Sequence, residues 1–254
     1  MKFNEQELEF ELKIPEYEIP VFGYKVGELR LIPKSSDDID ILPFSGLTQY
    51  LADNEIKICT FRGTENIRII RLLESVGFKF VSTYCIAECK KHEFTELSSS
   101  GLLNIQKATP DDYDEILRIS SSVSDYSTFA IDPMIDKAII VKRNAARTKS
   151  IFKKPNQCVY FVKIDGVIAG FIQYDIDLEN KTAYTQSAAV HPDYQKRKVG
   201  ESLFSQSIKT LLAEDIELLV NNSFSTQNIG SSKLHMKCNF KIVDHEIHMR
   251  YFNK

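Results

Sequence analysis

The sequence has no long apolar run and contains little glycine and proline. Its 10 Gly and 8 Pro indicate an ordered chain, because disordered and fibrous proteins are enriched in these residues. No stretch approaches the roughly 18 apolar residues of a membrane-spanning helix, and residues 1–7, MKFNEQE, lack the apolar segment of a signal peptide. These absences exclude fibrous and membrane-spanning classes and predict a cytoplasmic globular protein with no membrane partner.

Cysteine pairs and excess charge are also missing. The five cysteines are an odd number and include no Cys-x-x-Cys spacing, which predicts reduced thiols, no disulfide and no structural metal. The formal net charge of −3 does not favour a nucleic acid polymer as partner, since such partners select basic surfaces. With 254 residues, of which 43% are hydrophobic and 26% charged, the chain is long enough for one large or two small soluble domains.

Among the features that are present, the segment 191–204, HPDYQKRKVGESLF, is the most informative. It follows a predicted strand, 183–190, and opens a predicted helix in which leucine and isoleucine recur at helical spacing. The first amides of a helix lack intrahelical partners and carry the positive end of its dipole, so they bind anions. Gly200 permits a close approach to such an anion, and the basic run 196–198 adds positive charge. The segment therefore predicts a phosphate-binding turn.

Two stretches of the sequence, 65–81 and 227–243, can be superposed without a gap. Asn66 then matches Asn228 at an offset of 162 residues (228 − 66). Each stretch follows a similar apolar strand. The repeat predicts two related αβ units, joined at the segment 96–101, ELSSSG, whose composition is typical of a linker.

The two predicted units differ at the phosphate-binding turn. The same offset places residues 33–38, PKSSDD, over residues 195–200, and this segment has no glycine and ends in two acidic residues. It is therefore not expected to bind a phosphate group. We predict a degenerate N-terminal domain at residues 1–98, which has a structural role or helps to shape a ligand pocket, and a functional domain at residues 102–254.

Three motifs of the second half resemble the GNAT superfamily of N-acyltransferases. Gln195, Lys198 and Gly200 occupy the defined positions of that family's acyl-CoA pyrophosphate loop. The segment 228–240, NIGSSKLHMKCNF, is similar to its second motif, NxxAxxLYxxxGF, and 160–172 looks like its central hairpin, with Asp-Gly as a two-residue turn. The resemblance implies an α/β (α+β) fold with two GNAT-like domains, each a central mixed sheet flanked by helices.

The resemblance implies acetyl-CoA or another short acyl-CoA as the cosubstrate, and no metal. In the family, a backbone amide meets the thioester carbonyl where the fourth strand separates from the fifth. This position corresponds here to Ala189 or Val190. The other residues expected to bind acyl-CoA are Gln195, Lys196, Arg197, Lys198, Val199, Gly200, Asn228 and Ser231.

The sequence departs from the family at the group that donates a proton to the CoA thiolate. The usual donor is a tyrosine in the second motif, and His235 stands in its place. A neutral imidazole donates well only if its pKa is raised or its N–H is suitably aimed. His235 is therefore one candidate for the catalytic acid. The alternative is that His235 lines the CoA channel while water, Ser231 or a tyrosine supplies the proton.

A general base is harder to assign, because no carboxylate lies between Lys181 and His191. This absence suits an acceptor amine that is less basic than lysine, such as one flanked by hydroxyl-bearing carbons. A water relay past Tyr184, Gln186 or Ser187 would then suffice. Of these residues, Tyr184 is the side chain that we assign to catalysis.

Segments 20–30, 73–83 and 129–133 are similar to a narrower group of GNAT enzymes, the two-domain TDP-fucosamine acetyltransferase type. These enzymes acylate the amine of dTDP-linked amino-dideoxy sugars for surface polysaccharides, as in lipopolysaccharide biosynthesis. The resemblance implies a small nucleotide-sugar acceptor, and we expect specificity to reside in residues 120–156. Aromatic rings can stack on a base or a sugar, and a carboxylate can meet hydroxyl or ammonium groups. The candidate acceptor residues are Tyr126, Phe129 and Asp132.

Other functions stay open on the sequence alone. The acceptor can be another small amine or a protein N-terminus, and a non-catalytic acyl-CoA sensor would also retain the pyrophosphate motif. The small residues Ser187, Ala188 and Ala189 leave room for an acyl group longer than acetyl, such as 3-hydroxybutyryl. The sequence does not determine the oligomeric state, and a homodimer is compatible with it.

Overall fold

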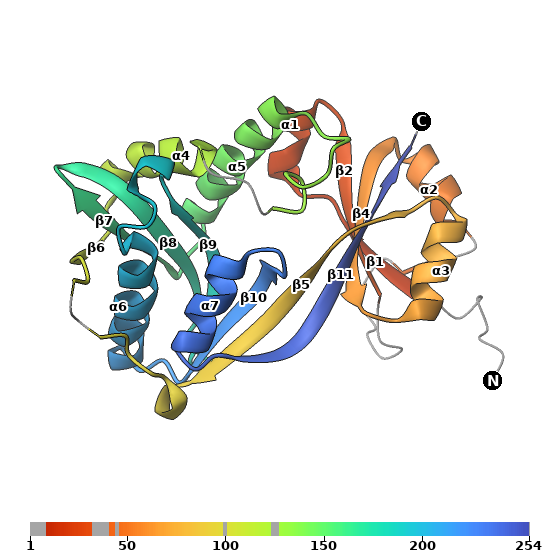
Figure 1. The fold of residues 1–254 in the computed structure, drawn as a ribbon. Helices are drawn as coiled ribbons and strands as arrows, with labels where there is room; N and C mark the ends of the chain where they lie inside the picture. Colours follow the sequence, from red (N-terminus) through yellow and green to blue (C-terminus); the bar gives the residue numbers. More distant parts are fainter. Residues whose placement is uncertain (1–8, 32–40, 44–45, 99–100, 123–126, 254) are drawn as a thin grey trace. The chain divides into compact units, whose positions relative to one another are not determined.

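A computed structural model of the chain describes residues 9–31, 41–43, 46–98, 101–122 and 127–253 (Figure 1). The chain divides into two compact units. The first comprises residues 1–84 and 245–254, and the second comprises residues 85–244. Each unit contains a sheet with helices packed on it, so the mixed α/β class expected from the sequence is confirmed.

The strands that belong to the first unit follow the sheet order β3-β1-β2-β4-β11. Its strands are β1 (Glu9–Lys13), β2 (Lys25–Leu31), β3 (Ile41–Pro43), β4 (Ile56–Thr64) and β11 (Lys241–Phe252), and its helices are η2 (Glu16–Glu18), α1 (Ile19–Phe22), α2 (Leu47–Asp53) and α3 (Ile67–Ser75). One face of the sheet packs on α2 and α3, where Leu29, Phe61 and Leu73 are buried. β2 and β4 run parallel and stay paired from Lys25 with Ile56 to Arg30 with Arg62.

The sheet of the second unit has the strand order β5-β10-β9-β8-β7-β6. Its strands are β5 (Lys79–Lys90), β6 (Ile105–Lys107), β7 (Gln157–Ile164), β8 (Val167–Asp177), β9 (Thr182–Val190) and β10 (Leu218–Ser225), and its helices are η4 (Lys91–Glu93), η5 (Pro110–Asp112), α4 (Tyr113–Ser122), α5 (Lys137–Phe152), η6 (Pro192–Tyr194), α6 (Val199–Ala213) and α7 (Ile229–Lys237). The predicted hairpin is β7 and β8. Its two turn residues, Asp165 and Gly166, have φ of 53° and 81°, the left-handed values that a type I′ turn requires.

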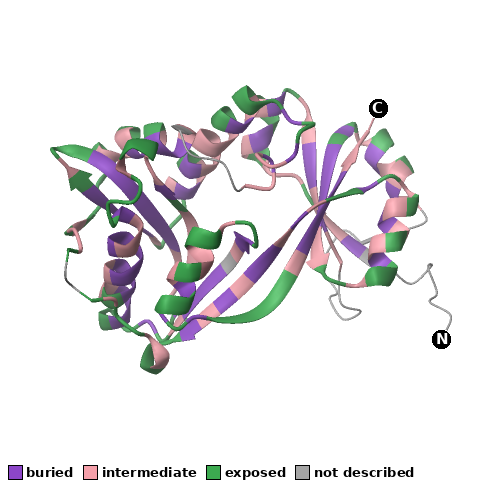
Figure 2. Ribbon diagram, viewed as in Figure 1, coloured by how far each residue is buried: buried purple, intermediate pink, exposed green. Residues whose placement is uncertain are grey.

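Helices cover both faces of this second sheet, and β7 and β8 are buried along much of their length (Figure 2). On one face, Ile116 of α4 packs with Val159 and Phe171. On the other face, Leu203 of α6 packs with Ile172, and α7 joins the same core. Because successive side chains of a strand point to opposite faces, β8 residues with odd numbers from Phe171 onward face α4 and those with even numbers face α6; a register shift before Gly170 reverses the order, so that Ile168 packs with the α4 core.

The internal repeat is visible in the structure. At the offset of 162 residues, α3 coincides with α7 and β5 coincides with β11, with the same first and last residues (229 − 67 and 241 − 79). Each helix begins at the matched asparagine. The side chain of Asn66 accepts hydrogen bonds from the amides of Arg68 and Ile69, and that of Asn228 accepts one from the amide of Ser231. Both therefore act as N-caps.

The compact units divide at other places than the sequence boundary of residues 98–102. The division falls within β5, after Tyr84, and within β11, before His245. Each of these strands starts in the unit of its preceding helix and ends in the other unit. Cys85 and Cys89 of β5 pack in the core of the second unit, whereas β11 pairs with β4 of the first. The composition of a linker marks a change of element along the chain. It does not show where a long strand leaves one compact unit and enters the other.

Candidate active site

The parallel strands β9 and β10 separate part of the way along. Their pairing runs from Thr182 with Leu218 to Thr185 with Asn221, and the described residues show none beyond it. The cause is local: the register of β8 against β9 shifts so that Gln186 has no partner on β8, and a bulge of this kind bends its strand. We call the separated strand ends, residues 186–190 and 223–225, the fork.

The structure chooses between the two amides that the resemblance left open at the fork. The amide of His191 donates to the carbonyl of Ala169 on β8, at 2.9 Å. Because the backbone groups of consecutive residues in a strand point to opposite edges, the amide of Val190 points away from β8. It faces the edge from which β10 has separated. Val190, and not Ala189, therefore directs its amide into the fork.

The turn between β9 and α6 is an exposed loop with backbone donors at its end. Lys196 and Lys198 have φ of 61° and 62°, in the left-handed region, and the four residues 195–198 are exposed. Within the described chain, no side chain caps the first amides of α6. These amides and the dipole of α6 form an anion site. The guanidinium of Arg197 lies 5.5 Å from the ring centroid of Tyr194. This contact holds one basic group beside the anion site.

The protein leaves space in front of Gly200. A Cβ at this position would meet only the Val190 Cγ2 atom, at 3.8 Å. Packing of the protein therefore does not require glycine at this position. The open space lies against both the first turn of α6 and the end of β9, where the resemblance places the pyrophosphate of acyl-CoA. The residues present fit that group.

Gly170 on β8 is a residue of the site that sequence reasoning missed. It lies opposite Val190, and a Cβ there would approach the Ala189 carbonyl oxygen to 2.8 Å and the Val199 Cγ1 atom to 2.9 Å. Only glycine lets β8, the end of β9 and the start of α6 meet this closely. The sequence signal, one glycine within a buried strand pattern, indicates close backbone approach but does not say to what.

On α7, the N-cap bond uses the side-chain oxygen of Asn228, at 3.0 Å from the Ser231 amide nitrogen. Asn66 makes the same kind of cap in the first unit, so capping alone accounts for an asparagine at this position. Contact of Asn228 or Ser231 with acyl-CoA stays a prediction.

His235 is buried in an aromatic cluster, with 2% of its surface exposed. Its ring stacks on Phe224 at 4.4 Å between centroids and meets the edges of Phe204 and Phe240. Its Nδ1 donates to the Ser231 carbonyl oxygen at 2.7 Å, which fixes the tautomer because a carbonyl only accepts. Its Nε2 then accepts from the Asn221 side-chain amide, also at 2.7 Å.

These contacts leave His235 without an N–H for a thiolate. Burial, the largest influence, lowers the pKa of His235 to about 4, although the hydrogen bond to Ser231 opposes the shift. The ring is therefore neutral at pH 7, with its one N–H already used. The geometry favours the alternative in which His235 packs and another group supplies the proton.

We expect His235→Phe to change kcat by less than about threefold, because the ring packing is kept and no proton donor is lost. Stability should fall by about 1–3 kcal/mol, since the buried Asn221 amide loses its partner. Thermal unfolding and steady-state kinetics with acetyl-CoA measure the two effects. If kcat instead fell by about two orders of magnitude at an unchanged KM for acetyl-CoA, His235 would be the proton donor.

The lowered pKa of His235 also predicts a pH dependence of stability. Unfolding returns the ring to an ordinary pKa near 6.5, so the unfolded chain binds the proton first as pH falls. The contribution of His235 is full above about pH 6.5 and is lost progressively toward pH 4. The difference in Tm between wild type and His235→Phe should therefore shrink between pH 6.5 and 4. A difference that stays constant across this range would contradict the assignment.

The region expected to hold the acceptor lies on the α4 and α5 side of the sheet. Tyr126 is outside the described residues. Phe129 and Asp132 are 6% and 7% exposed, and Asp132 accepts a hydrogen bond from the Met134 amide at 2.9 Å, so both take part in the loop's own structure. Tyr184 lies half-buried on β9, opposite Asp175 of β8, on the face that carries Phe171.

Sequence reasoning missed two arginines of α5 that lie on this side. The Arg143 guanidinium carbon lies 3.7 Å from the ring centroid of Phe129. Arg147, one helical turn later, donates to the carbonyl oxygen of the bulged residue Gln186 at 3.1 Å. Their spacing of four residues is the signal that could have found them, because it places both on one face of a helix.

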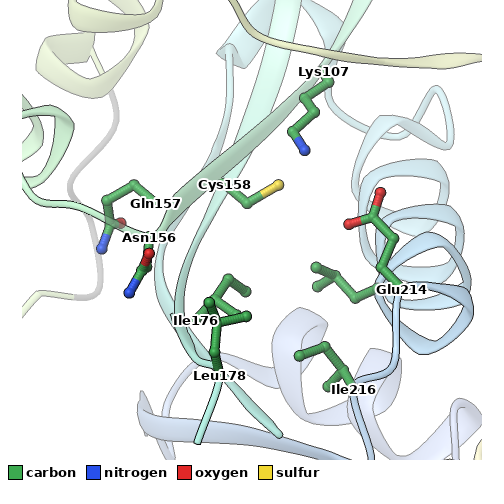
Figure 3. Close-up of a pocket in the computed structure, with 9 residues that line it drawn as sticks. Lys107, Asn156, Gln157, Cys158, Ile176, Leu178, Glu214 and Ile216 are labelled. Carbon is green, nitrogen blue, oxygen red and sulfur yellow. The ribbon is translucent and has the colours of Figure 1, made fainter.

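A separate cavity of about 180 Å³ lies in the second unit, at the end of α6 opposite the loop (Figure 3). Figure 3 shows the Cys158 thiol between Lys107 and Glu214. Burial raises the pKa of this thiol, so it stays protonated and unreactive. None of the residues that line the cavity belongs to the fork or to the loop before α6.

Metal-ligand and membrane-spanning patterns do not occur in the described part of the chain. It contains no group of His, Cys, Asp and Glu arranged to hold a metal ion. None of its helices is long and apolar enough to cross a membrane.

Comparisons with known proteins agree with this geometry. The model of the acetyltransferase (GNAT) family matches residues 124–240, a segment that contains the fork, the loop before α6 and the helix α7. This segment therefore resembles a GNAT acetyltransferase domain. The family match supports an N-acetyltransferase, and acetyl-CoA is the cosubstrate of the GNAT family. No curated protein matches the sequence.

Several solved structures share the fold of the whole chain at low sequence identity. A functionally unknown conserved protein from Staphylococcus epidermidis is 10% identical, with a TM-score of 0.64 over 94% of this chain and 90% of its own. A GCN5-related N-acetyltransferase from Sphaerobacter thermophilus is 11% identical, with a TM-score of 0.61 over 96% and 76%. A tandem GNAT protein from the clavulanic acid biosynthesis pathway is 10% identical, with a TM-score of 0.59 over 90% and 78%. The tandem neighbour fits the two-domain arrangement expected from the repeat.

Proposed function

We propose that this N-acetyltransferase transfers an acetyl or short acyl group directly from acyl-CoA to the amine of a dTDP-linked amino-dideoxy sugar. The observation that carries the proposal is the arrangement around the fork. The anion-binding start of α6 lies on one side of it, and the side chains of the bulged strand and of α5 lie on the other. Resemblance of segments 20–30, 73–83 and 129–133 to sugar acetyltransferases supports this acceptor.

The donor half of the proposal rests on the loop and the fork. We propose that the first amides of α6, with Gly200 and the basic residues 196–198, bind the pyrophosphate of acyl-CoA. Lys198 is the N-cap residue of α6 and has a left-handed backbone conformation, and its side chain does not cap the following amides. The Val190 amide would then donate to the thioester carbonyl oxygen, where negative charge develops during transfer.

The acceptor half rests on the α5 side of the sheet. A nucleoside diphosphate sugar presents two phosphates and a flat base. Two guanidinium groups one helical turn apart suit a diphosphate, because arginine binds phosphate oxygens with two donors. The buried ring of Phe129 stacks against Arg143 and helps to hold its guanidinium group. This combination supports an anionic acceptor over a polyamine, which two guanidinium groups would repel.

The chemical step requires one new bond, one broken bond and two proton movements. The neutral amine attacks the thioester carbon, the C–N bond forms, and the C–S bond to CoA breaks. The amine loses a proton and the CoA thiolate gains one. Because β9 carries no carboxylate and His235 is enclosed, we assign the amine proton to a water relay beside Tyr184.

The test is an assay of free thiol release from acetyl-CoA with a panel of dTDP-amino-dideoxyhexoses. We expect release with one of them. The controls are the same amino sugars without the nucleotide, a polyamine and a peptide with a free N-terminus. Release with only a control amine would replace the sugar by that acceptor, and acyl-CoA binding without turnover of any amine would indicate a sensor.

A variant tests the role of α5 separately. Arg143→Met should raise the KM for the nucleotide sugar by about 10-fold or more, since a charged hydrogen bond contributes about 1.5–3 kcal/mol, and should leave the KM for acetyl-CoA unchanged. Methionine keeps an apolar contact with Phe129, so the fold should hold. Lys142→Met, at the neighbouring exposed position, is the matched control. Equal effects of both variants would mean that only the net charge of α5 matters.

A further inference from the structure

Gln173 of β8 is a fully buried side chain without a hydrogen-bond partner. It is 0% exposed, and neither its Nε2 nor its Oε1 bonds to any group in the described chain. Buried amides are nearly always paired, because an unpaired one loses its bonds to water and gains nothing in return. An orphaned amide in a strand core is therefore a candidate contact for a partner that the protein itself does not supply.

The position of Gln173 connects it to the fork. It lies opposite Ser187 of β9, at the register shift that leaves Gln186 bulged. It shares the face of β8 with Phe171, which packs against α4. Gly170, the residue opposite Val190, is three residues away, which is about 10 Å along a strand. Gln173 thus lies on the acceptor side of the sheet, on the strand beside the fork.

The chemistry of an amide defines the group that it fits. A glutamine side chain offers two N–H donors and one oxygen acceptor. A sugar hydroxyl both donates and accepts, so one or two ring hydroxyls can satisfy the amide. An acceptor without hydroxyl groups offers no such hydrogen bond to the amide. Recognition by a buried polar group is also the strongest form of discrimination, because an analogue without the hydroxyl leaves the amide unpaired.

We propose that Gln173 is an acceptor-binding residue whose amide hydrogen-bonds a ring hydroxyl of the amino sugar. The proposal rests on the proposed function, because it assumes a hydroxylated acceptor. Arg147, which holds the carbonyl of Gln186 at 3.1 Å, keeps the bulge beside Gln173 in place. The unpaired amide lowers the stability of the free protein, and hydrogen bonds to the bound sugar would remove this cost.

A second orphaned glutamine provides the matched control. Both amide atoms of Gln157 are likewise buried without a partner in the described chain. Gln157 lies opposite Asp175, on the same face of the sheet but two residues farther along β8 from the fork. A purely structural effect of replacing a buried amide should therefore appear at both positions, and an effect on the acceptor only at Gln173.

The experiment compares Gln173→Met and Gln157→Met in the full chain. We expect both variants to keep the Tm or raise it by about 2–4 °C, since methionine fills the space without polar atoms. Gln173→Met alone should lower kcat/KM for the dTDP-amino sugar by about 10- to 100-fold, with the KM for acetyl-CoA within about twofold. Wild type should likewise disfavour an analogue of the sugar that lacks one ring hydroxyl, and Gln173→Met should lose that preference.

Three results would overturn the proposal. The first is an unchanged kcat/KM for the sugar in Gln173→Met. The second is an equal loss in Gln157→Met, and the third is no discrimination by wild type against any deoxy analogue, a measurement that needs no variant to fold. Absence of turnover with every dTDP-amino sugar would overturn the proposed function itself, so the two failures are distinguishable.

Discussion

Gly200→Asp is expected to raise the KM for acetyl-CoA by about 10- to 100-fold without lowering the Tm. The aspartate would project into the open space beside the Val190 Cγ2 atom, where the pyrophosphate is expected. It would repel the phosphates and obstruct their bonds to the α6 amides, each about 1.5–3 kcal/mol for a charged partner. The fold should not suffer, because an acidic residue in the first turn of a helix is favourable by about 0.3–1 kcal/mol.

The experiment separates a blocked site from a damaged fold, because the KM for acetyl-CoA should rise while the Tm does not fall. A damaged fold would lower the Tm and the affinity together, whereas a blocked site lowers the affinity alone. Gly200→Ala is the control, because its Cβ meets an ordinary contact distance of 3.8 Å and alanine favours a helix over glycine by about 0.5–1 kcal/mol. An unchanged KM in Gly200→Asp would remove the start of α6 from the donor site.

Gly170→Ala should have the reverse profile, with a loss of stability of about 1–3 kcal/mol. The added Cβ would lie 2.8 Å from the Ala189 carbonyl oxygen and 3.2 Å from the Val190 Cα atom. Both are backbone atoms, so neither can move without shifting β9. Because Val190 carries the amide that points into the fork, the KM for acetyl-CoA should rise as well.

Differential scanning calorimetry and steady-state kinetics measure both consequences of Gly170→Ala. About 1 kcal/mol corresponds to roughly 2–4 °C in Tm for a domain of this size. Acetyl-CoA at saturating concentration should restore part of the lost Tm, since a ligand that binds only the folded state stabilises it. If Gly170→Ala matches Gly200→Ala in both measurements, β8 and β9 do not approach as closely as we describe.

The corresponding parallel strands of the first unit do not separate into a fork. Its parallel strands β2 and β4 stay paired up to Arg62. The Arg62 guanidinium lies 2.9 Å from Glu246 of β11 and 3.5 Å from Glu28 of β2, which ties β4 to both neighbours. At the offset of 162 residues, the second unit has Phe224 in this place (224 − 62). This difference supports a structural role for the first unit, as its acidic segment 33–38, outside the described residues, also predicts.

The sequence by itself determined the features that depend on local spacing. The hairpin turn at Asp165, the helix that follows the basic run 196–198 and the two asparagine caps all follow from residues close along the chain, whose conformations neighbouring residues specify. The family resemblance came from the same local patterns. The sequence also showed that His235 stands at the position of the family's tyrosine. It did not show that the imidazole is buried with its one N–H already used.

Only the tertiary structure decided the features that depend on pairing between distant strands. The direction of the Val190 amide follows from its alignment with β8, and the constraint on Gly170 follows from three elements that meet there. His235 could have lined a channel or packed in a core, and aromatic side chains from β10, from α6 and from the residue before β11 enclosed it. Gln173 reads in sequence as one polar residue in an apolar strand; its isolation beneath the bulge exists only once the sheet has formed.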